Sequence, residues 1–541
     1  MKRLESMVVV IGNTLYSTNA AVLIPGMRCA AGLAKCPLKA IEKSLPVMVR
    51  QILDIIKQTG NTESELVQVA FKSLATVLRD GPPVQVKEKD LVYLIELLTP
   101  DLEDPTRQAS IFTLLRAIVA RKFVVPEIYD LMEKVSEVAV TSQSPQVREL
   151  CRGVLLQFLL DYPQGKGRLR NQMAFFAKNI SYVHESGRTS IMELLDAVIT
   201  KFQVNLVREY ADLLFVALVM VVANDDSAKC REMGAQLIKN LFMRLDEEHR
   251  NIVLSHLHSW ALQDAQPQLR WVSAQVSGFI FDVAQSDALS YVSAILDDLK
   301  VLLHHSATVT AIDEDQDDSR MNVELEWQLP YHTLTVLAKI LRVFPTFDNQ
   351  DKVGWDLVVA HLLFPHAWVR TAACRLLGLL FSIAPVALPQ PDLPDGHPLS
   401  KPGVTNVAKK LSQQLKSEHL DDVLSLQIVK NLFYLGKCFY LFPVGEDEGL
   451  ANEPAVALLE NEPNEDKKHL NNPLSWLFSK LSYQVKSGHI ARRNRAACKV
   501  TLLLFLRNLD IHLRSAQLVS TTLSWFTLVC RNGFSYGCYK P

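Results

Sequence analysis

A basic residue recurs in this sequence at a nearly constant interval, and this repeat restricts the possible folds more than any other feature. The spacings are 41, 40, 41 and 41 residues between Arg107, Arg148, Arg188, Lys229 and Arg270, and Arg370 follows 100 residues later. Turn or capping residues precede each copy, and apolar residues at helical spacing follow it, as in Leu194, Leu195, Val198 and Ile199. A repeat of this length indicates stacked structural units rather than a single compact core.

Partner helices are predicted between these copies, for example over Val125–Val138, Leu169–Tyr182 and Asn205–Val222. Two antiparallel helices per period of about 40 residues are typical of HEAT and armadillo repeats. One helix pair cannot bury its own apolar stripe, so neighbouring pairs must stack to complete a core. The sequence therefore predicts an all-α, HEAT/armadillo-like α-solenoid, a superhelical stack of antiparallel helix pairs.

Composition supports helices and excludes several other classes. Hydrophobic residues make up 48% of the 541 residues, with only 21 Gly and 25 Pro, which excludes a disordered or collagen-like chain. The 57 basic and 58 acidic residues nearly cancel, so contact with nucleic acid must come from local patches. The longest apolar run, 213–223, has about half the length of a bilayer helix, so we expect no membrane contact and an intracellular protein.

The repeat and the breaks in it predict a domain organisation with five parts. Helical repeats with a period near 41 cover 1–311, an acidic loop covers 312–325, further repeats cover 326–384, a Pro-rich connector covers 385–403, and C-terminal helical repeats with an acidic insertion at 445–472 cover 404–541. Six prolines in 385–402 exclude a regular helix there.

No arrangement of residues in the sequence nominates an active site. Nucleophile-elbow, dinucleotide-binding and phosphate-loop motifs are absent, and His256 and His258 point apart on a predicted helix. The cysteines include no C-x-x-C pair and no Cys/His cluster at zinc spacing. We therefore expect no catalytic residue, cofactor, metal or small-molecule substrate, and binding as the default function of such an exposed surface.

Two basic clusters are the candidate contacts with RNA phosphates or protein partners. One is the turn "PQGKGRLRNQ", and the other is "HIARRNRAACK"; they provide Lys166, Arg168 and Arg170, and Arg492, Arg493, Arg495 and Lys499. Each is also consistent with a solvated turn or helix start. The repeated residues Arg107, Arg148, Arg188, Lys229, Arg270 and Arg370 fit RNA contacts less well than a structural ladder that pairs with acidic residues of the next repeat.

From Asp104 to Cys230 the chain resembles the small-subunit processome component 20 family, also called down-regulated in metastasis. The segments that carry the resemblance are "RQA…LL.AI..RK..VPEI", "LDYPQGKGRLRNQ", "Y.HE.GR" and "NDDSAKC", and a fainter match continues at "PHAWVRTAACRLLGLLF". Their order and length make the match specific. The resemblance places the chain as a C-terminal portion of a much longer protein, which makes it a fragment, an isoform or the product of an imperfect gene model.

The resemblance implies a scaffold that is not an enzyme, located in the nucleus and nucleolus. Its partners are then small-subunit processome proteins, pre-rRNA and the small nucleolar RNA particle, contacted directly or indirectly during early pre-rRNA cleavage and 18S rRNA maturation. Two other classes stay open from the residues alone. One is a solenoid transport adaptor or other protein–protein scaffold, and the other is the helical-repeat region of a large kinase-like protein.

Overall fold

A computed structural model describes residues 2–104, 106–263, 265–313, 327–345, 353–386, 393–415 and 420–440, together with Leu477. All regular structure in these ranges is helical, with no strand. Clustering of contacts divides the chain into two units, Met1–Val253 and Leu254–Pro541. The boundary falls inside a helix, α14 (Glu247–Ala261), and each unit is described by itself.

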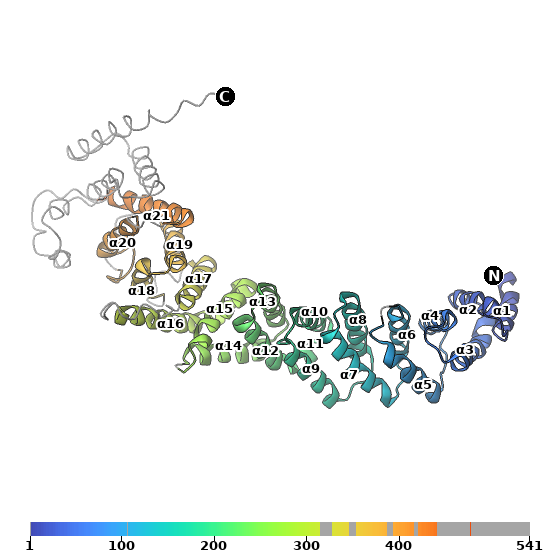
Figure 1. Cartoon of the computed structure of the whole chain (residues 1–541). Helices are drawn as coiled ribbons and strands as arrows, with labels where there is room; N and C mark the ends of the chain where they lie inside the picture. Colours follow the sequence, from blue (N-terminus) through green and yellow to red (C-terminus); the bar gives the residue numbers. More distant parts are fainter. Residues whose placement is uncertain are drawn as a thin grey trace, which may run out of the picture. The chain divides into compact units, whose positions relative to one another are not determined.

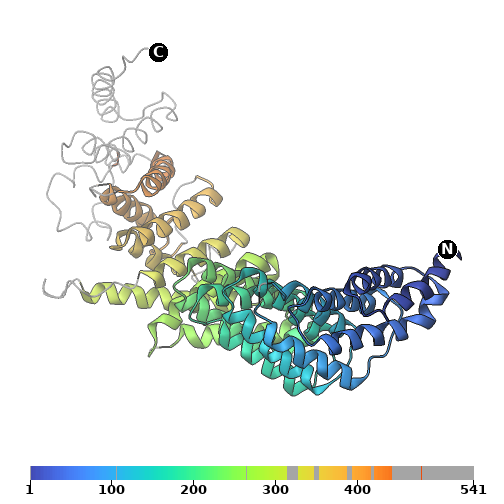
Figure 2. The same cartoon turned by 45° about the vertical axis from the view of Figure 1, so that its right-hand side comes forward.

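The first unit consists of helices that pair and stack (Figures 1 and 2). They are α1 (Lys2–Thr14), α2 (Ala20–Ala34), α3 (Lys39–Thr59), α4 (Glu65–Asp80), α5 (Glu88–Leu98), α6 (Gln108–Ala120), α7 (Pro126–Thr141), α8 (Pro145–Asp161), α9 (Lys166–Asn179), α10 (Glu185–Lys201), α11 (Val204–Glu209), α12 (Ala211–Asn224) and α13 (Ala228–Met243). The helices α2, α4, α6, α8, α10 and α13 contact one another in that order and form one layer, and α1 with α3, α5 with α7, and α9 with α12 pack in the other.

The second unit repeats this arrangement. Its helices are α15 (Pro267–Ala284), α16 (Val292–Asp313), α17 (Gln328–Val343), α18 (Trp355–Ala360), α19 (Ala367–Ile383), α20 (Lys401–Gln414) and α21 (Asp422–Tyr440). The helices α15, α17, α19 and α21 contact one another in sequence and form one layer, whereas α16 packs on α17 and α18, and α20 packs on α21. The described chain is an all-α HEAT/armadillo-like solenoid, which confirms the fold class that the period predicts.

Each helix of the continuous layers is buried on two sides because it packs between neighbours. In α4, Phe71, Leu74 and Ala75 have no exposed surface. Burial of a side chain the size of Phe or Leu stabilises the fold by about 1.5–3 kcal/mol, and many such side chains hold adjacent repeats together. The core therefore runs from pair to pair within a unit, as stacked repeats require.

Two predicted segments differ from the structure. The helix predicted over Asn205–Val222 is two helices, because Tyr210 leaves helical geometry (φ −106°, ψ 5°) and separates α11 from α12. At the other position, α20 begins at Lys401, inside the predicted connector 385–403. The hydroxyl oxygen of Ser400 accepts a hydrogen bond from the Gly403 N–H, and Pro402 fits the first turn, where its missing N–H needs no partner.

The other predicted domain limits lie largely outside the described residues. The helix α16 continues through Asp313, so the start of the predicted acidic loop is helical, and 314–326 lie outside the description. The acidic insertion at 445–472 and nearly all of the last predicted part after Tyr440 are outside it too. The division inside α14 has no counterpart among the predicted limits, because a continuous helix leaves no linker to detect.

Candidate interaction surfaces

The repeated arginine lies at the same position of five helices, four residues after the helix N-cap. The N-cap and arginine pairs are Ser144 and Arg148, His184 and Arg188, Ser227 and Arg231, Gln266 and Arg270, and His366 and Arg370. In four of the five helices the guanidinium reaches back to carbonyl oxygens five or six residues earlier, at 2.5–3.0 Å. These arginines therefore fasten each helix to the connection that precedes it.

Arg188 also joins one repeat to the next, as the ladder hypothesis expects. Its Nε lies 2.9 Å from a carboxylate oxygen of Asp225, and its Nη2 lies 2.6 Å from one of Asp226. Arg188 and Asp225 are both nearly buried. In contrast, Arg107 pairs within its own repeat, with Asp101 at 2.7 Å, and with the preceding repeat through Glu63, also at 2.7 Å.

The other ladder positions differ in their contacts. Arg148 donates only to the Ser142 carbonyl oxygen among its described contacts, Arg370 donates to those of Phe364 and Pro365, and an Nη of Arg270 lies 2.6 Å from His305 Nε2. Among the described contacts, Arg188 is the ladder residue that pairs with acidic residues of the next repeat.

Lys229 does not occupy the structural position that its spacing suggested. It is exposed, and it makes no hydrogen bond or ion pair among the described residues. The N-cap of α13 is Ser227, so the fourth residue after it is Arg231, whose Nη1 donates to the carbonyl oxygens of Asp225 and Asp226. The interval from Arg188 to the equivalent arginine is therefore 43 residues instead of 41.

The first basic cluster lies at the start of α9, after a connection fixed by aromatic side chains. Lys166 is the first residue of α9, and Arg168 and Arg170 are exposed. The guanidinium carbon of Arg168 lies 3.7 Å from the centre of the Tyr129 ring. The Tyr129 hydroxyl donates to the Pro163 carbonyl oxygen at 2.8 Å, so the cation rests on an anchored ring.

Tyr162 holds the same connection from the other side. Its hydroxyl donates to the Phe123 carbonyl oxygen at 2.7 Å, and its ring packs against Tyr129 and Phe158. Burial raises the pKa of Tyr162 to about 12, so this hydroxyl keeps its proton and remains a donor at neutral pH. Arg168 and Arg170 thus lie at the start of α9, directly after this fixed connection. The second cluster, Arg492, Arg493, Arg495 and Lys499, lies outside the described residues.

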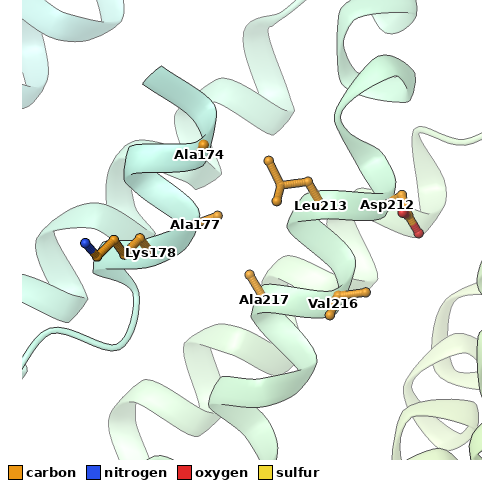
Figure 3. Close-up of a pocket in the computed structure, with 7 residues that line it drawn as sticks. All are labelled: Ala174, Ala177, Lys178, Asp212, Leu213, Val216 and Ala217. Carbon is orange, nitrogen blue, oxygen red and sulfur yellow. The ribbon is translucent and has the colours of Figure 1, made fainter. Parts of the chain in front are cut away.

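A shallow apolar groove separates α9 from α12 (Figure 3). Its volume is about 510 Å³, and Ala174, Ala177, Lys178, Asp212, Leu213, Val216 and Ala217 line it. The small alanines leave the space, and Leu213 and Val216 keep more than a third of their surface exposed. Lys178 and Asp212 are the two charged residues of the lining, and the other five lining residues are apolar.

A strip of aromatic rings in the second unit is a feature that the sequence reasoning missed. It lies where α15, α17 and α19 begin, and it includes Trp271, Trp327 and Trp368. The sequence does contain a pattern that could have revealed the strip, because Trp271 follows Arg270 and Trp368 lies two residues before Arg370. The repeated arginine therefore marks the positions of two of the rings.

Two further properties concern the described part of the chain as a whole. None of the helices there combines the length and the hydropathy that crossing a membrane requires. No group of three or more His, Cys, Asp or Glu side chains in those ranges is placed to hold a metal ion.

The repeated helix pairs and their arginine-fastened connections define a helical-repeat protein of the HEAT/armadillo-like class. No family model matches the chain. It is 33% identical over 447 residues to U3 small nucleolar RNA-associated protein 20 of Schizosaccharomyces pombe and 30% identical over 396 residues to that of Saccharomyces cerevisiae, covering 81% and 71% of this chain. The chain belongs to this family, the small-subunit processome component 20 family, as the sequence resemblance predicts.

The matched part is a small fraction of those relatives. The chain spans 17% of the length of the fission-yeast protein and 15% of that of the budding-yeast protein. Among solved structures, importin beta matches with a TM-score of 0.40 at 12% identity over 98% of this chain and 60% of that one. Kap121p bound to Pho4p matches with a TM-score of 0.39 at 14% identity, over 97% and 54%. Likeness at these TM-scores has no weight for fold or function.

Proposed function

We propose that the chain is a scaffold segment of the small-subunit processome, which holds pre-rRNA and assembly proteins for early pre-rRNA cleavage and 18S rRNA maturation. The supporting observation is the identity of 33% over 447 residues to a protein named for its association with U3 small nucleolar RNA. The matched length exceeds the whole first unit, so the relationship concerns the stack of repeats and not one short motif.

The proposed role is architectural, and separate enzymes cut the RNA. In a stack of helix pairs, the inner faces pack against neighbouring pairs and the outer faces stay accessible to partners. Many weak contacts along such a surface together give a high affinity, because each contact raises the effective concentration for the next. The repeated arginines support this role because their guanidinium groups are engaged in fastening connections. The location that follows is the nucleolus.

Within this role, the basic start of α9 is the proposed contact with RNA phosphates or acidic protein segments. The helix carries Lys166, Arg168, Arg170 and Lys178 and no acidic residue. Arg168 is held on the Tyr129 ring, which reduces the side-chain freedom lost on binding. Arg492, Arg493, Arg495 and Lys499 are proposed as a second contact on their sequence alone.

Sedimentation of the tagged chain from cell extracts tests this function. We expect co-sedimentation with pre-ribosomal particles, nucleolar staining, and reduced co-sedimentation for the double variant Arg168→Glu/Arg170→Glu. The matched control is Lys201→Glu, an exposed charge reversal at the end of α10 in the same unit. A chain that stays in the light fractions and in the cytoplasm contradicts the function, whereas unchanged sedimentation of the double variant removes only that contact.

A further inference from the structure

Six aromatic rings form a continuous strip over the beginnings of α15, α17 and α19. In order along the strip they are Trp271, His332, Tyr331, Trp368, Trp327 and His366. Successive ring centres are 5.9, 5.3, 6.2, 4.7 and 4.6 Å apart. The strip crosses three successive helices of one layer, so it belongs to the repeat stack and not to a single turn.

The exposure of these rings differs from that of core aromatics. Trp368 is the exposed member of the strip, with 56% of its surface accessible, and the other five residues are half-buried. Trp355, in the same unit, is only 4% exposed and shows how a tryptophan of the core packs here. An exposed tryptophan that continues a run of rings offers a flat face to a planar ligand.

The rings are held in fixed orientations. Trp327 stacks on His366 with an interplanar angle of 9°, and Trp368 meets Trp327 edge-on at 83°. His366 is the N-cap of α19, and its Nδ1 accepts a hydrogen bond from the Trp368 backbone N–H at 3.3 Å. A ring fixed in this way loses little freedom when a ligand stacks on it.

Charge near the strip selects among planar ligands. The first turns of α15, α17 and α19 contain no acidic residue, and Arg370 lies at the start of α19 beside His366 and Trp368. Arg270, at the start of α15, is nearly buried, with 7% of its surface exposed. Burial and the nearby Arg370 lower the pKa of His366, so this ring is neutral at neutral pH. The Arg370 cation beside the strip opposes a cationic ligand and favours an anionic one.

We propose that this aromatic strip binds single-stranded RNA by stacking its bases. RNA joins planar rings to a negative backbone, and stacking on aromatic side chains is the usual way in which proteins hold unpaired bases. The proposal rests on the proposed function, since it names a surface by which a processome segment contacts RNA. Trp368 is the most exposed of the six rings, and its face is the proposed stacking surface for a base.

Purified full-length chain and fluorescein-labelled oligonucleotides test the strip directly. We expect a twelve-nucleotide single-stranded RNA to bind and to quench tryptophan fluorescence. An abasic oligonucleotide of equal length and a duplex of the same sequence are expected to bind about ten-fold more weakly, because neither offers free bases. Equal binding of the abasic chain overturns the proposal, because phosphate attraction alone then explains the affinity.

Substitutions of the exposed ring separate stacking from folding. Trp368→Ala is expected to weaken RNA binding about ten-fold, and Trp368→Phe to restore most of it, because the phenyl ring still stacks. The control is Tyr16→Ala, which removes an aromatic residue of similar exposure, 60%, from the first unit. Unchanged affinity of Trp368→Ala, or an equal loss in Tyr16→Ala, overturns the proposal.

A third arm tests the sign of the charge preference. We expect the purified chain to bind the twelve-nucleotide RNA more tightly than a polylysine peptide of similar length. Tighter binding of polylysine overturns the proposal. If RNA binding fails while the tagged chain still co-sediments with pre-ribosomal particles, this inference is lost and the proposed function stands.

Discussion

Arg188 is only 7% exposed, and its guanidinium contacts two carboxylates and two backbone carbonyl oxygens. Replacing it with Ala leaves Asp225 buried without its cation, and breaking such a pair costs about 3 kcal/mol. We expect Arg188→Ala to lower the free energy of unfolding of the first unit by that amount in urea titration. Lys229→Ala, at an exposed position of the same helix stack, is the control and is expected to change it by less than about 0.5 kcal/mol.

Histidines with lowered pKa values make the stability of the second unit depend on pH. Burial lowers the pKa of His332 to about 4, from an ordinary value of 6.5, and burial also lowers the pKa of His361. The folded state therefore holds His332 neutral, so its stabilising contribution is complete above pH 6.5 and is lost as the pH falls towards 4.

For His332 alone this loss amounts to about 3 kcal/mol. We expect unfolding of the full chain, followed by tryptophan fluorescence, to need less urea at pH 4.5 than at pH 7. The variant His332→Phe is expected to show a weaker pH dependence, with His361 responsible for part of what remains. An identical pH profile in both proteins contradicts the assignment to His332.

At single positions, the sequence predicted which residues repeat but not all of their contacts. The interval of about 41 residues located Arg148, Arg188 and Arg270 correctly at the starts of their helices, and the similar segment 100 residues later located Arg370. The interval selected Lys229 over Arg231, because a fixed period read along the chain does not detect a shift of two residues in one repeat. The strip of rings was also missed, since its members lie up to 97 residues apart in the sequence and meet only through stacking.

Individual helices depend on their first turns, where backbone N–H groups lack partners within the helix. The Ser227 hydroxyl oxygen accepts a hydrogen bond from the Cys230 N–H and caps α13, while the Ser400 hydroxyl oxygen caps α20. We expect Ser227→Ala to lower the free energy of unfolding by about 1 kcal/mol, and Ser227→Asp to restore it, because both hydroxyl and carboxylate oxygens accept that bond. Equal losses in both variants, measured by urea unfolding, exclude capping as the cause.

Helix positions were largely predictable, whereas the division between α11 and α12 was not. Apolar spacing and turn residues predicted the helices that became α7 and α9 to within a few residues. The break at Tyr210 has no Gly or Pro to mark it, and the ring there is only 6% exposed. The division between α11 and α12 therefore coincides with a nearly buried ring and not with a helix-breaking residue.

Within each unit, stacked repeats share one core, so damage to one helix should spread to its neighbours. Phe71 of α4 has no exposed surface, and Phe71→Ala is expected to cost about 3–5 kcal/mol. Because α4 contacts α2 and α6, we expect faster amide hydrogen exchange in all three helices, with α17 and α19 of the other unit unchanged. Exchange that rises only inside α4, or equally in both units, contradicts a core shared from pair to pair.

At the scale of the whole molecule, we propose that this stack of helix pairs, related to proteins named for association with U3 small nucleolar RNA, acts as a scaffold on pre-rRNA. Crosslinking of the tagged chain in cells, followed by sequencing of the bound RNA, tests this most directly. The account predicts enrichment of U3 RNA and of pre-rRNA spacer and 18S sequences over an untagged control. Recovery of none of these RNAs, while a tagged full-length relative in the same cells recovers them, contradicts it.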